Sequence, residues 1–281
     1  MSQILDGKQV VEALNTRLQK QVVGLQNRGI QPQLAIVRVG ERADDISYEK
    51  GLLKRCETIG VTVKQFTLPA EVGQEQLLQQ IKAINANPDL HGLLLFRPLP
   101  GHIDDLVIRQ AIDPAKDVDG ITEQSLAGVF TKSDTGFGPA TAEACLEVLD
   151  HFGYELKGKH AVVIGRSLVV GRPLSMMLLR HQATVTICHR YTKDLPSLAR
   201  QADILLVAVG RAKMVDASYL RPGQVIIDVG INVDESGSLC GDVDFAAAEQ
   251  IVEAITPVPG GIGTVTTSVL VKHVIEAAER Q

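Results

Sequence analysis

The sequence predicts an α/β protein with two lobes. Short apolar segments typical of buried strands alternate with segments of helical periodicity, which favours mostly parallel sheets covered by helices. The 281 residues exceed what one compact core usually holds. A proline- and glycine-rich break at 97–102 and a polar loop at 132–138 interrupt the alternation, and a second series of strands and helices starts after them. We therefore expect two domains.

The first series predicts an α/β domain at 1–138. Strand-helix-strand patterns at this spacing are typical of a parallel, buried sheet. Its predicted helices are 10–27, 46–60 and 73–85, and its predicted strands are 33–39, 61–66 and 92–96.

The second series predicts a Rossmann-type domain at 139–265, which begins with a helix at 141–152. The last helix, at 266–279, is expected to pack back on the first domain, so the segment 266–281 is assigned there. The predicted strands of the second series are 161–164, 184–187, 204–207, 225–229 and 254–255.

Composition narrows the function classes. Basic and acidic residues are mixed along a chain of net charge −5, so no surface for nucleic acid or for an anionic membrane is expected. No segment reads as a membrane span, and the N-terminus does not resemble a secretion signal. These features predict a cytoplasmic protein that acts on small molecules. The cysteines lack disulfide or metal-binding spacing, and no metal site is expected; they are Cys56, Cys145, Cys188 and Cys240.

A strand-glycine-helix junction at 161–173 is the strongest local motif. Gly165, Ser167 and Gly171 follow a buried strand and precede an apolar helix. Free backbone N–H groups and the positive end of a helix suit a pyrophosphate there. The spacing differs from G-x-G-x-x-G, so a plain tight turn between strand and helix stays the alternative.

The end of the next strand favours NADP over NAD. An NAD site usually carries an acidic residue there for the ribose hydroxyls, whereas this chain has Cys188, His189 and Arg190. Arg166 and Arg190 are candidates for a 2′-phosphate, because guanidinium groups offer paired donors to phosphate. The alternative is that both arginines are solvated loop charges. His189 is interpreted as structural.

Two further loops, at 207–210 and 228–232, end strands of the same predicted sheet. Gly210 has no side chain, so the backbone there can approach a flat cofactor ring. Ile231 is the candidate neighbour of a nicotinamide. A simple need for tight turns would explain the same glycines.

The candidate substrate side contains an acidic loop at 116–120 and a rigid segment at 256–263. One carboxylate can accept two parallel N–H bonds, so Asp119 is a candidate for binding the amidine-like edge of a heterocycle. The alternative is an aspartate that only shapes its loop. In the rigid segment, proline fixes the turn and glycine admits close approach.

Eight motifs occur in order along nearly the whole chain. They are I-L-D-G-K, V-G-x6-S-Y, P-L-P, K-D-V-D-G, V-V-I-G-R-S-x-x-V-G-R-P, D-V-G-I-N, G-D-V-D-F and T-P-V-P-G-G-I-G. Together they resemble the methylenetetrahydrofolate dehydrogenase/methenyltetrahydrofolate cyclohydrolase family. The resemblance implies a cleft between an N-terminal folate-side domain and a Rossmann-type NADP-binding domain, usually in a homodimer.

The resemblance also implies roles for individual residues. Asp119 would hold the pterin edge and Tyr48 would line the folate site, which the segment with Pro259, Gly260 and Gly261 would border. The implied cofactor contacts are the loop of Gly165, Arg166 and Ser167, with Gly171, Arg190, Gly210 and Ile231.

Two folate-side positions depart from the family. There, a lysine four residues after the tyrosine is the principal cyclohydrolase residue, and here that position is Leu52. A glutamine of the family is replaced by Phe96. On a helix, Leu52 lies about 40° from Tyr48, whereas Lys50 and Lys54 project roughly 160° and 120° away.

The sequence therefore predicts NADP-dependent oxidation of methylenetetrahydrofolate to methenyltetrahydrofolate, with cyclohydrolase activity lost or impaired. Arg55 returns to the Tyr48 face but stays protonated, so it can supply charge but hardly a base. Three alternatives stay open: an intact bifunctional enzyme, an NADP-dependent dehydrogenase of another substrate, and a noncatalytic folate- or nucleotide-binding paralogue. The changes at Phe96, Arg97 and Ala140 motivate the second of these.

Overall fold

A computed structural model describes residues 2–280, which form two compact units. The six-stranded unit joins the N-terminal segment up to Glu12 with Thr141–Thr266, and the three-stranded unit joins Ala13–Ala140 with the segment that starts at Thr267. The borders fall inside or at the first residue of three helices, α1 (Gly7–Asn27), α6 (Ala140–His151) and α10 (Ile262–Arg280).

The N-terminal segment differs from the sequence-based domain assignment, which placed it in the first domain. Strand β1 (Gln3–Ile4) pairs in parallel with β11 (Ala254–Ile255), so residues 2–12 belong to the six-stranded unit. A strand of two residues is too short to show a periodicity that could be read from sequence. Met1 and Gln281, which the predicted domains included, lie outside the described residues.

The six-stranded sheet is parallel and doubly wound, with strand order β1-β11-β8-β7-β5-β6. The strand order reverses at β5, which has β6 on one side and β7 on the other. Ligands of such sheets bind beyond the carboxyl ends of the strands at this switch point. The remaining strands are β5 (His160–Ile164), β6 (Thr184–Cys188), β7 (Ile204–Val207) and β8 (Val225–Asp228), and the helices are α7 (Gly171–Arg180), α8 (Leu195–Arg200), α9 (Phe245–Ala248) and the short η2 (Ala217–Tyr219).

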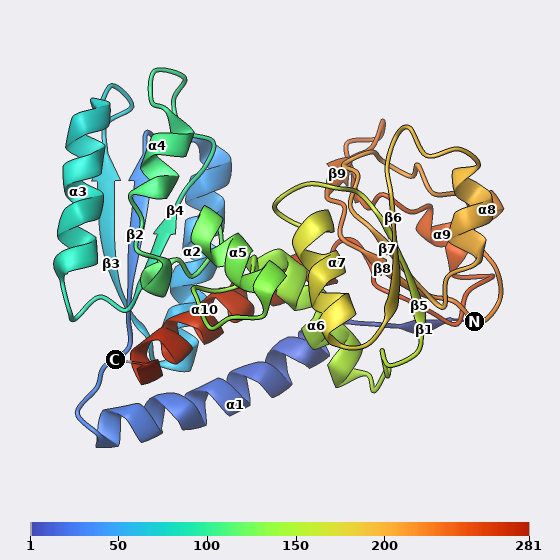
Figure 1. Ribbon diagram of the computed structural model, residues 1–281, viewed down its shortest axis with the longest axis horizontal. Helices are drawn as coiled ribbons and strands as arrows, with labels where there is room; N and C mark the ends of the chain where they lie inside the picture. The colour runs from blue at the N-terminus through green and yellow to red at the C-terminus, as the bar shows by residue number, and fades with distance from the viewer. Residues whose placement is uncertain (1, 281) are drawn as a thin grey trace. The chain divides into compact units, whose positions relative to one another are not determined.

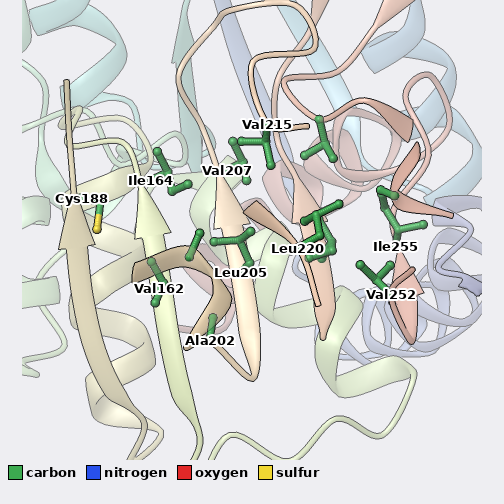
Figure 2. Close-up of a cluster of buried hydrophobic side chains, with 14 residues drawn as sticks. Val162, Ile164, Cys188, Ala202, Leu205, Val207, Val215, Leu220, Val252 and Ile255 are labelled. Atoms are coloured by element: carbon green, nitrogen blue, oxygen red, sulfur yellow. The ribbon is translucent and has the colours of Figure 1, made fainter. Parts of the chain in front are cut away.

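Apolar side chains from neighbouring strands form the core of this unit (Figure 2). Val162 of β5, Leu205 of β7 and Ile226 of β8 are completely buried on one side of the sheet, and Ala199 of α8 and Ala248 of α9 belong to the same cluster. Because this packing fixes the strands, it also fixes where the loops beyond their carboxyl ends begin. A small antiparallel hairpin, β9 (Asn232–Val233) with β10 (Leu239–Cys240), follows β8.

The three-stranded unit is a parallel sheet of order β3-β2-β4, with α3 lying along it (Figure 1). Strand β2 (Gln33–Val39) has the bounds that the sequence predicted. Helices α4 (Asp105–Gln110) and α5 (Glu123–Thr131) were not predicted, because each is too short for a clear 3.6-residue period. The other elements are β3 (Thr62–Leu68), β4 (Gly92–Leu95), α2 (Ala43–Ile59), α3 (Gln74–Ala86) and the short η1 (Pro114–Lys116).

Both faces of β2 are buried, as expected for a parallel sheet covered by helices. Val37 and Ile81 of α3 lie in one apolar cluster, whereas Leu34 points to the opposite face. On that opposite face, a Cβ at Gly92 would lie 2.6 Å from Val118 Cγ1. Glycine therefore lets the K-D-V-D-G segment pack directly against the sheet.

Lys116 connects this segment to the C-terminal end of α3. Its side chain is 4% exposed, and its Nζ donates to the carbonyl oxygens of Ile84, Asn85 and Asn87 at 3.1, 2.8 and 2.6 Å. These carbonyls lie at the end of the helix, where Ile84 O also accepts from Asn87 N and Asn87 O also accepts from Leu90 N. Burial lowers the pKa of Lys116, and the carboxylate of Asp113 opposes that change.

We predict that Lys116→Met lowers the free energy of unfolding by about 2–3 kcal/mol, because methionine fills the space but removes the buried ammonium group that donates to three carbonyl oxygens. Urea unfolding monitored by circular dichroism measures the change. Lys82→Met is the matched control, since Lys82 is an exposed lysine of α3, the helix whose end Lys116 contacts. Its effect should stay within about 0.5 kcal/mol. Equal effects of the two substitutions would contradict this role of Lys116.

Candidate functional site

A glycine cradle lies at the switch point of the six-stranded sheet. Gly165, directly after β5, has φ 135°, and a Cβ on it would collide with the carbonyl oxygen of Ala208 after β7. A Cβ on Gly171 would collide with the carbonyl oxygen of Gly165. Ser167 Oγ accepts from Val170 N at 3.0 Å and shapes the loop that leads into α7. The loop thus brings bare backbone to the N-terminal end of a helix, which fits a pyrophosphate.

Two exposed arginines, Arg166 and Arg190, follow the carboxyl ends of the adjacent strands β5 and β6. The guanidinium group of Arg190 lies 4.7 Å from the ring centroid of Tyr191. His189 shapes this turn, because its N donates to Thr192 Oγ1 at 2.9 Å and its Nδ1 accepts from Tyr191 N at 3.2 Å. The geometry leaves both arginine side chains at the surface beside the cradle.

The other predicted cofactor residues lie after β7 and β8. Gly210 has φ 64°, a backbone conformation that favours glycine. Ile231 is 65% exposed although it is aliphatic, so its side chain is available to a flat ligand. Sequence reasoning missed two buried aspartates nearby, Asp228 and Asp242, whose carboxylates bind the backbone of these loops. Their positions in D-V-G-I-N and G-D-V-D-F were the available signal.

The segment with Pro259, Gly260 and Gly261 lies in the six-stranded unit, against the start of α1. Gly7 N donates to Gly260 O at 2.9 Å, and a Cβ on Gly7 would lie 2.5 Å from Gly261 O. The glycine of I-L-D-G-K is therefore needed for close packing against the glycine pair. Gly260 has φ 106°, which again favours glycine.

The three-stranded unit brings Tyr48 and Phe96 together. Their ring centroids are 5.9 Å apart with an interplanar angle of 76°, an edge-to-face contact. Leu52 on the same helix as Tyr48 is completely buried, whereas Lys50 and Lys54 are exposed. This exposure pattern agrees with the helical angles derived from the sequence.

The two aspartates of K-D-V-D-G have different environments. Asp117 is 1% exposed and accepts from Ile121 N at 3.0 Å and from Thr122 N at 2.8 Å. Ser125 Oγ donates to it at 2.6 Å. Asp117 therefore anchors the backbone that follows.

Asp119 is poised to titrate near neutral pH. Burial raises the pKa of Asp119 to about 7, and the nearby Asp117 carboxylate adds to this increase. The charges of His273 and Arg97 act in the opposite direction. Incoming N–H donors would favour the ionised form, so the site is electrostatically prepared for a ligand that donates hydrogen bonds.

The phenol of Tyr48 stays protonated at neutral pH. Desolvation by the surrounding protein, followed by the charge of Asp119, raises the pKa of Tyr48 above its ordinary value of 10.0, and a hydrogen bond with the Thr267 side chain opposes this. Tyr48 can therefore orient a ligand or donate a proton, but it does not supply a phenolate base.

Arg97 is paired with a carboxylate of α4. Its Nε and Nη2 donate to the two oxygens of Asp105 at 2.6 and 2.7 Å, and Arg109 Nε donates to the same carboxylate at 2.8 Å. Burial alone would raise the pKa of Asp105, but the hydrogen bonds from Arg97 and Arg109 lower it below its usual value. Arg97 thus contributes positive charge and no proton acceptor.

Residues 2–280 contain neither a helix suited to cross a membrane nor a cluster of metal-binding side chains. No helix there combines the length and apolar character that crossing a membrane requires. No group of three or more His, Cys, Asp or Glu side chains in these residues could hold a metal ion. All four cysteines are buried free thiols.

The doubly wound sheet with its glycine cradle defines a dinucleotide-binding enzyme of the α/β class, with a second α/β unit built on a three-stranded sheet. Two family models cover most of the chain: "Tetrahydrofolate dehydrogenase/cyclohydrolase, catalytic domain" matches residues 5–119, and "Tetrahydrofolate dehydrogenase/cyclohydrolase, NAD(P)-binding domain" matches residues 139–281. The chain belongs to the tetrahydrofolate dehydrogenase/cyclohydrolase family.

Known proteins of this family are similar over their whole length. "Bifunctional protein FolD" of Carboxydothermus hydrogenoformans is 51% identical over 281 residues, covering 99% of this chain and 98% of that protein. The solved structure of the bifunctional FolD enzyme from Campylobacter jejuni has a TM-score of 0.96 at 36% identity, covering 100% of this chain and 99% of that one. The Trypanosoma brucei enzyme, solved with NADP cofactor and an inhibitor, has a TM-score of 0.92 at 32% identity, covering 99% and 98%.

We predict that Asp119→Asn makes the protein progressively more stable than the parent as pH rises from 4 to 8. With a pKa near 7 in the folded state, Asp119 binds more protons folded than unfolded between its ordinary pKa of 3.8 and about 7, so raising the pH across that window destabilises the parent. Urea unfolding at several pH values should show the advantage of the variant growing by about 4 kcal/mol, because about three pKa units separate the folded and unfolded states and each is worth about 1.4 kcal/mol. A difference that does not change with pH would contradict the raised pKa.

Proposed function

We propose that this protein oxidises methylenetetrahydrofolate to methenyltetrahydrofolate with NADP, and that its cyclohydrolase activity is lost or strongly impaired. The observation that carries the proposal is the complete burial of Leu52 at the position where the family has its cyclohydrolase lysine. The homodimer and the cytoplasmic location that the sequence suggested stay predictions.

The glycine cradle fits NADP because it has no room for side chains and leaves the backbone at the start of α7 open to phosphate. When bound, NADP supplies the hydride acceptor, C4 of its nicotinamide. Arg166 and Arg190 would bind the 2′-phosphate, and Ile231 would contact the nicotinamide. The Trypanosoma brucei relative solved with NADP supports this cofactor.

Hydride transfer itself makes few chemical demands on the protein. The folate nitrogens next to the bridging methylene carbon stabilise the cation that hydride loss produces, so the protein mainly has to align donor and acceptor. Asp119 in its ionised form would hold the amidine-like pterin edge by paired hydrogen bonds. Tyr48 and Phe96 would form an aromatic wall beside the substrate.

Cyclohydrolysis makes a further demand, because water must add to the methenyl carbon and protons must move before the ring opens. Leu52 and Phe96 have no group that can carry a proton. Lys50 and Lys54 are exposed on other faces of α2, and Arg97 is bound to Asp105. This arrangement supports hydride transfer without efficient ring opening.

The second candidate is an intact bifunctional enzyme, which the names of the relatives favour. "Bifunctional protein FolD" is the name of relatives that are 50% and 51% identical over 99% of this chain. The two candidates share the dehydrogenase reaction and differ only in the fate of methenyltetrahydrofolate.

We predict that the purified protein reduces NADP when methylenetetrahydrofolate is supplied, with kcat/KM for NADP at least about tenfold above that for NAD, because two arginines offer charge to the 2′-phosphate. NADPH absorbance gives the rate. Absence of reduction with both cofactors would eliminate the dehydrogenase, and binding of both ligands without turnover would establish the noncatalytic alternative.

We predict that Leu52→Lys combined with Phe96→Gln raises methenyltetrahydrofolate hydrolysis at least about tenfold above the parent, because the pair introduces an amine of lowered pKa and a polar partner for it. Decay of supplied methenyltetrahydrofolate, corrected for the buffer rate, is the measurement. Leu53→Lys is the matched control: it adds the same charge one residue away on α2, a different face of the helix, and should leave the rate unchanged. A folded double variant with no gain would contradict the assigned role of position 52.

A further inference from the structure

Two buried carboxylates, Asp228 and Asp242, lie at the carboxyl end of the six-stranded sheet. Asp228 is 3% exposed and Asp242 is completely buried. Asp228 Oδ1 accepts from Gly230 N at 2.9 Å and from Asp242 N at 3.0 Å, and its Oδ2 accepts from Val243 N at 2.9 Å. Asp228 therefore fixes the backbone on which Asp242 is mounted.

Asp242 binds two loops with one carboxylate. Its Oδ2 accepts from Val209 N at 2.6 Å and from Gly210 N at 3.1 Å. Its Oδ1 accepts from Arg211 N at 2.7 Å and from Asn232 Nδ2 at 2.9 Å. Three of these donors follow β7 and the fourth follows β8, and these strands are neighbours in the sheet. The carboxylate thus sets the position of one loop relative to the other.

The residues before and after Ile231 in the sequence are each bound by one of the two aspartates. Gly230 is bound by Asp228, and Asn232 is bound by Asp242. The Cδ1 atom of Ile231 lies 3.2 Å from the position that a Cβ on Gly263 would take, so the side chain rests against that glycine. The exposed side chain of Ile231 is therefore presented from a fixed backbone.

Only glycine fits at the two positions beside the carboxylates of Asp228 and Asp242. A Cβ on Gly230 would collide with the carboxylate of Asp242, and a Cβ on Gly241 would collide with that of Asp228. The glycines of D-V-G-I-N and G-D-V-D-F thus make room for the aspartates of the opposite motif, which explains why the two motifs fit together.

We propose that Asp242 is a positioning residue for hydride transfer, acting through the loops 209–211 and 231–232 that would receive the nicotinamide. The inference rests on the proposed function. Asp242 has no exposed surface and acts only through backbone that other groups would contact. Because the cradle at Gly165 would supply much of the affinity for NADP, loss of Asp242 should affect alignment more than binding.

The test is Asp242→Asn in the full chain. The amide can accept through one oxygen, but its NH2 group would face other N–H donors, so at least one loop has to move. Since a displacement of about 1 Å can cost up to 100-fold in rate, kcat should fall at least about tenfold, while the Kd for NADP measured by calorimetry changes less than about threefold. With methylenetetrahydrofolate deuterated at the methylene carbon, the isotope effect on kcat should increase as hydride transfer becomes slower.

Two further variants keep the test decisive. Asn232→Ala removes one donor to Asp242 and should lower kcat about threefold with the fold intact, which covers the case in which Asp242→Asn does not fold. Asp244→Asn is the matched control, because Asp244 caps α9 two residues away and asparagine also caps helices. Its kcat and Kd for NADP should equal those of the parent.

The outcomes separate the inference from the proposed function. No NADP reduction by the parent protein would overturn the dehydrogenase proposal itself. An active parent with unchanged kcat in both Asp242→Asn and Asn232→Ala would overturn the inference alone. So would a fall in kcat matched by an equal loss of NADP affinity without a larger isotope effect, since that result indicates general loosening of the unit.

Discussion

Backbone N–H groups beyond the carboxyl ends of parallel strands have no partner in the sheet, and in this protein buried aspartates satisfy many of them. Asp228 and Asp242 do so in the six-stranded unit, whereas Asp117 in the three-stranded unit binds the N–H groups of Ile121 and Thr122 at the start of α5. Buried donors left unpaired are costly, so these carboxylates hold the loops in one arrangement. Asp119, Gly210 and Ile231, which would meet a ligand, depend on this anchoring because they lie on the same loops.

This anchoring separates the acidic residues that shape loops from the one that can recognise a ligand. Asp119 shares K-D-V-D-G with Asp117, yet its burial raises its pKa to about 7. A carboxyl group whose pKa lies near neutral pH becomes ionised more readily when a ligand donates hydrogen bonds to it. Under the proposed function, Leu52 and Phe96 stand where the family resemblance implies polar residues, whereas Asp119 and the glycines of the cofactor cradle are the residues that the resemblance implies.

The sequence was sufficient for the features that depend on local patterns. Mostly apolar runs located β2 and β5, and helix geometry separated Leu52 from the exposed Lys50 and Lys54. The pairing of β1 with β11 could not be foreseen, because it joins residues about 250 positions apart and two-residue strands have no pattern. The binding of Asp242 to three consecutive backbone amides could not be foreseen either, because it arises only when neighbouring strands bring separate loops together.

The central claim is that methenyltetrahydrofolate is released without ring opening. It is tested most directly by measuring which folate carries the one-carbon group after hydride transfer. Parent protein is given methylenetetrahydrofolate and NADP, and NADPH, methenyltetrahydrofolate and formyltetrahydrofolate are quantified together through the first turnovers. With Leu52 and Phe96 in place, methenyltetrahydrofolate should accumulate in equal amount to NADPH and then decay at the rate of buffer alone. Formyltetrahydrofolate that appears as fast as NADPH would contradict the claim and establish the intact bifunctional enzyme.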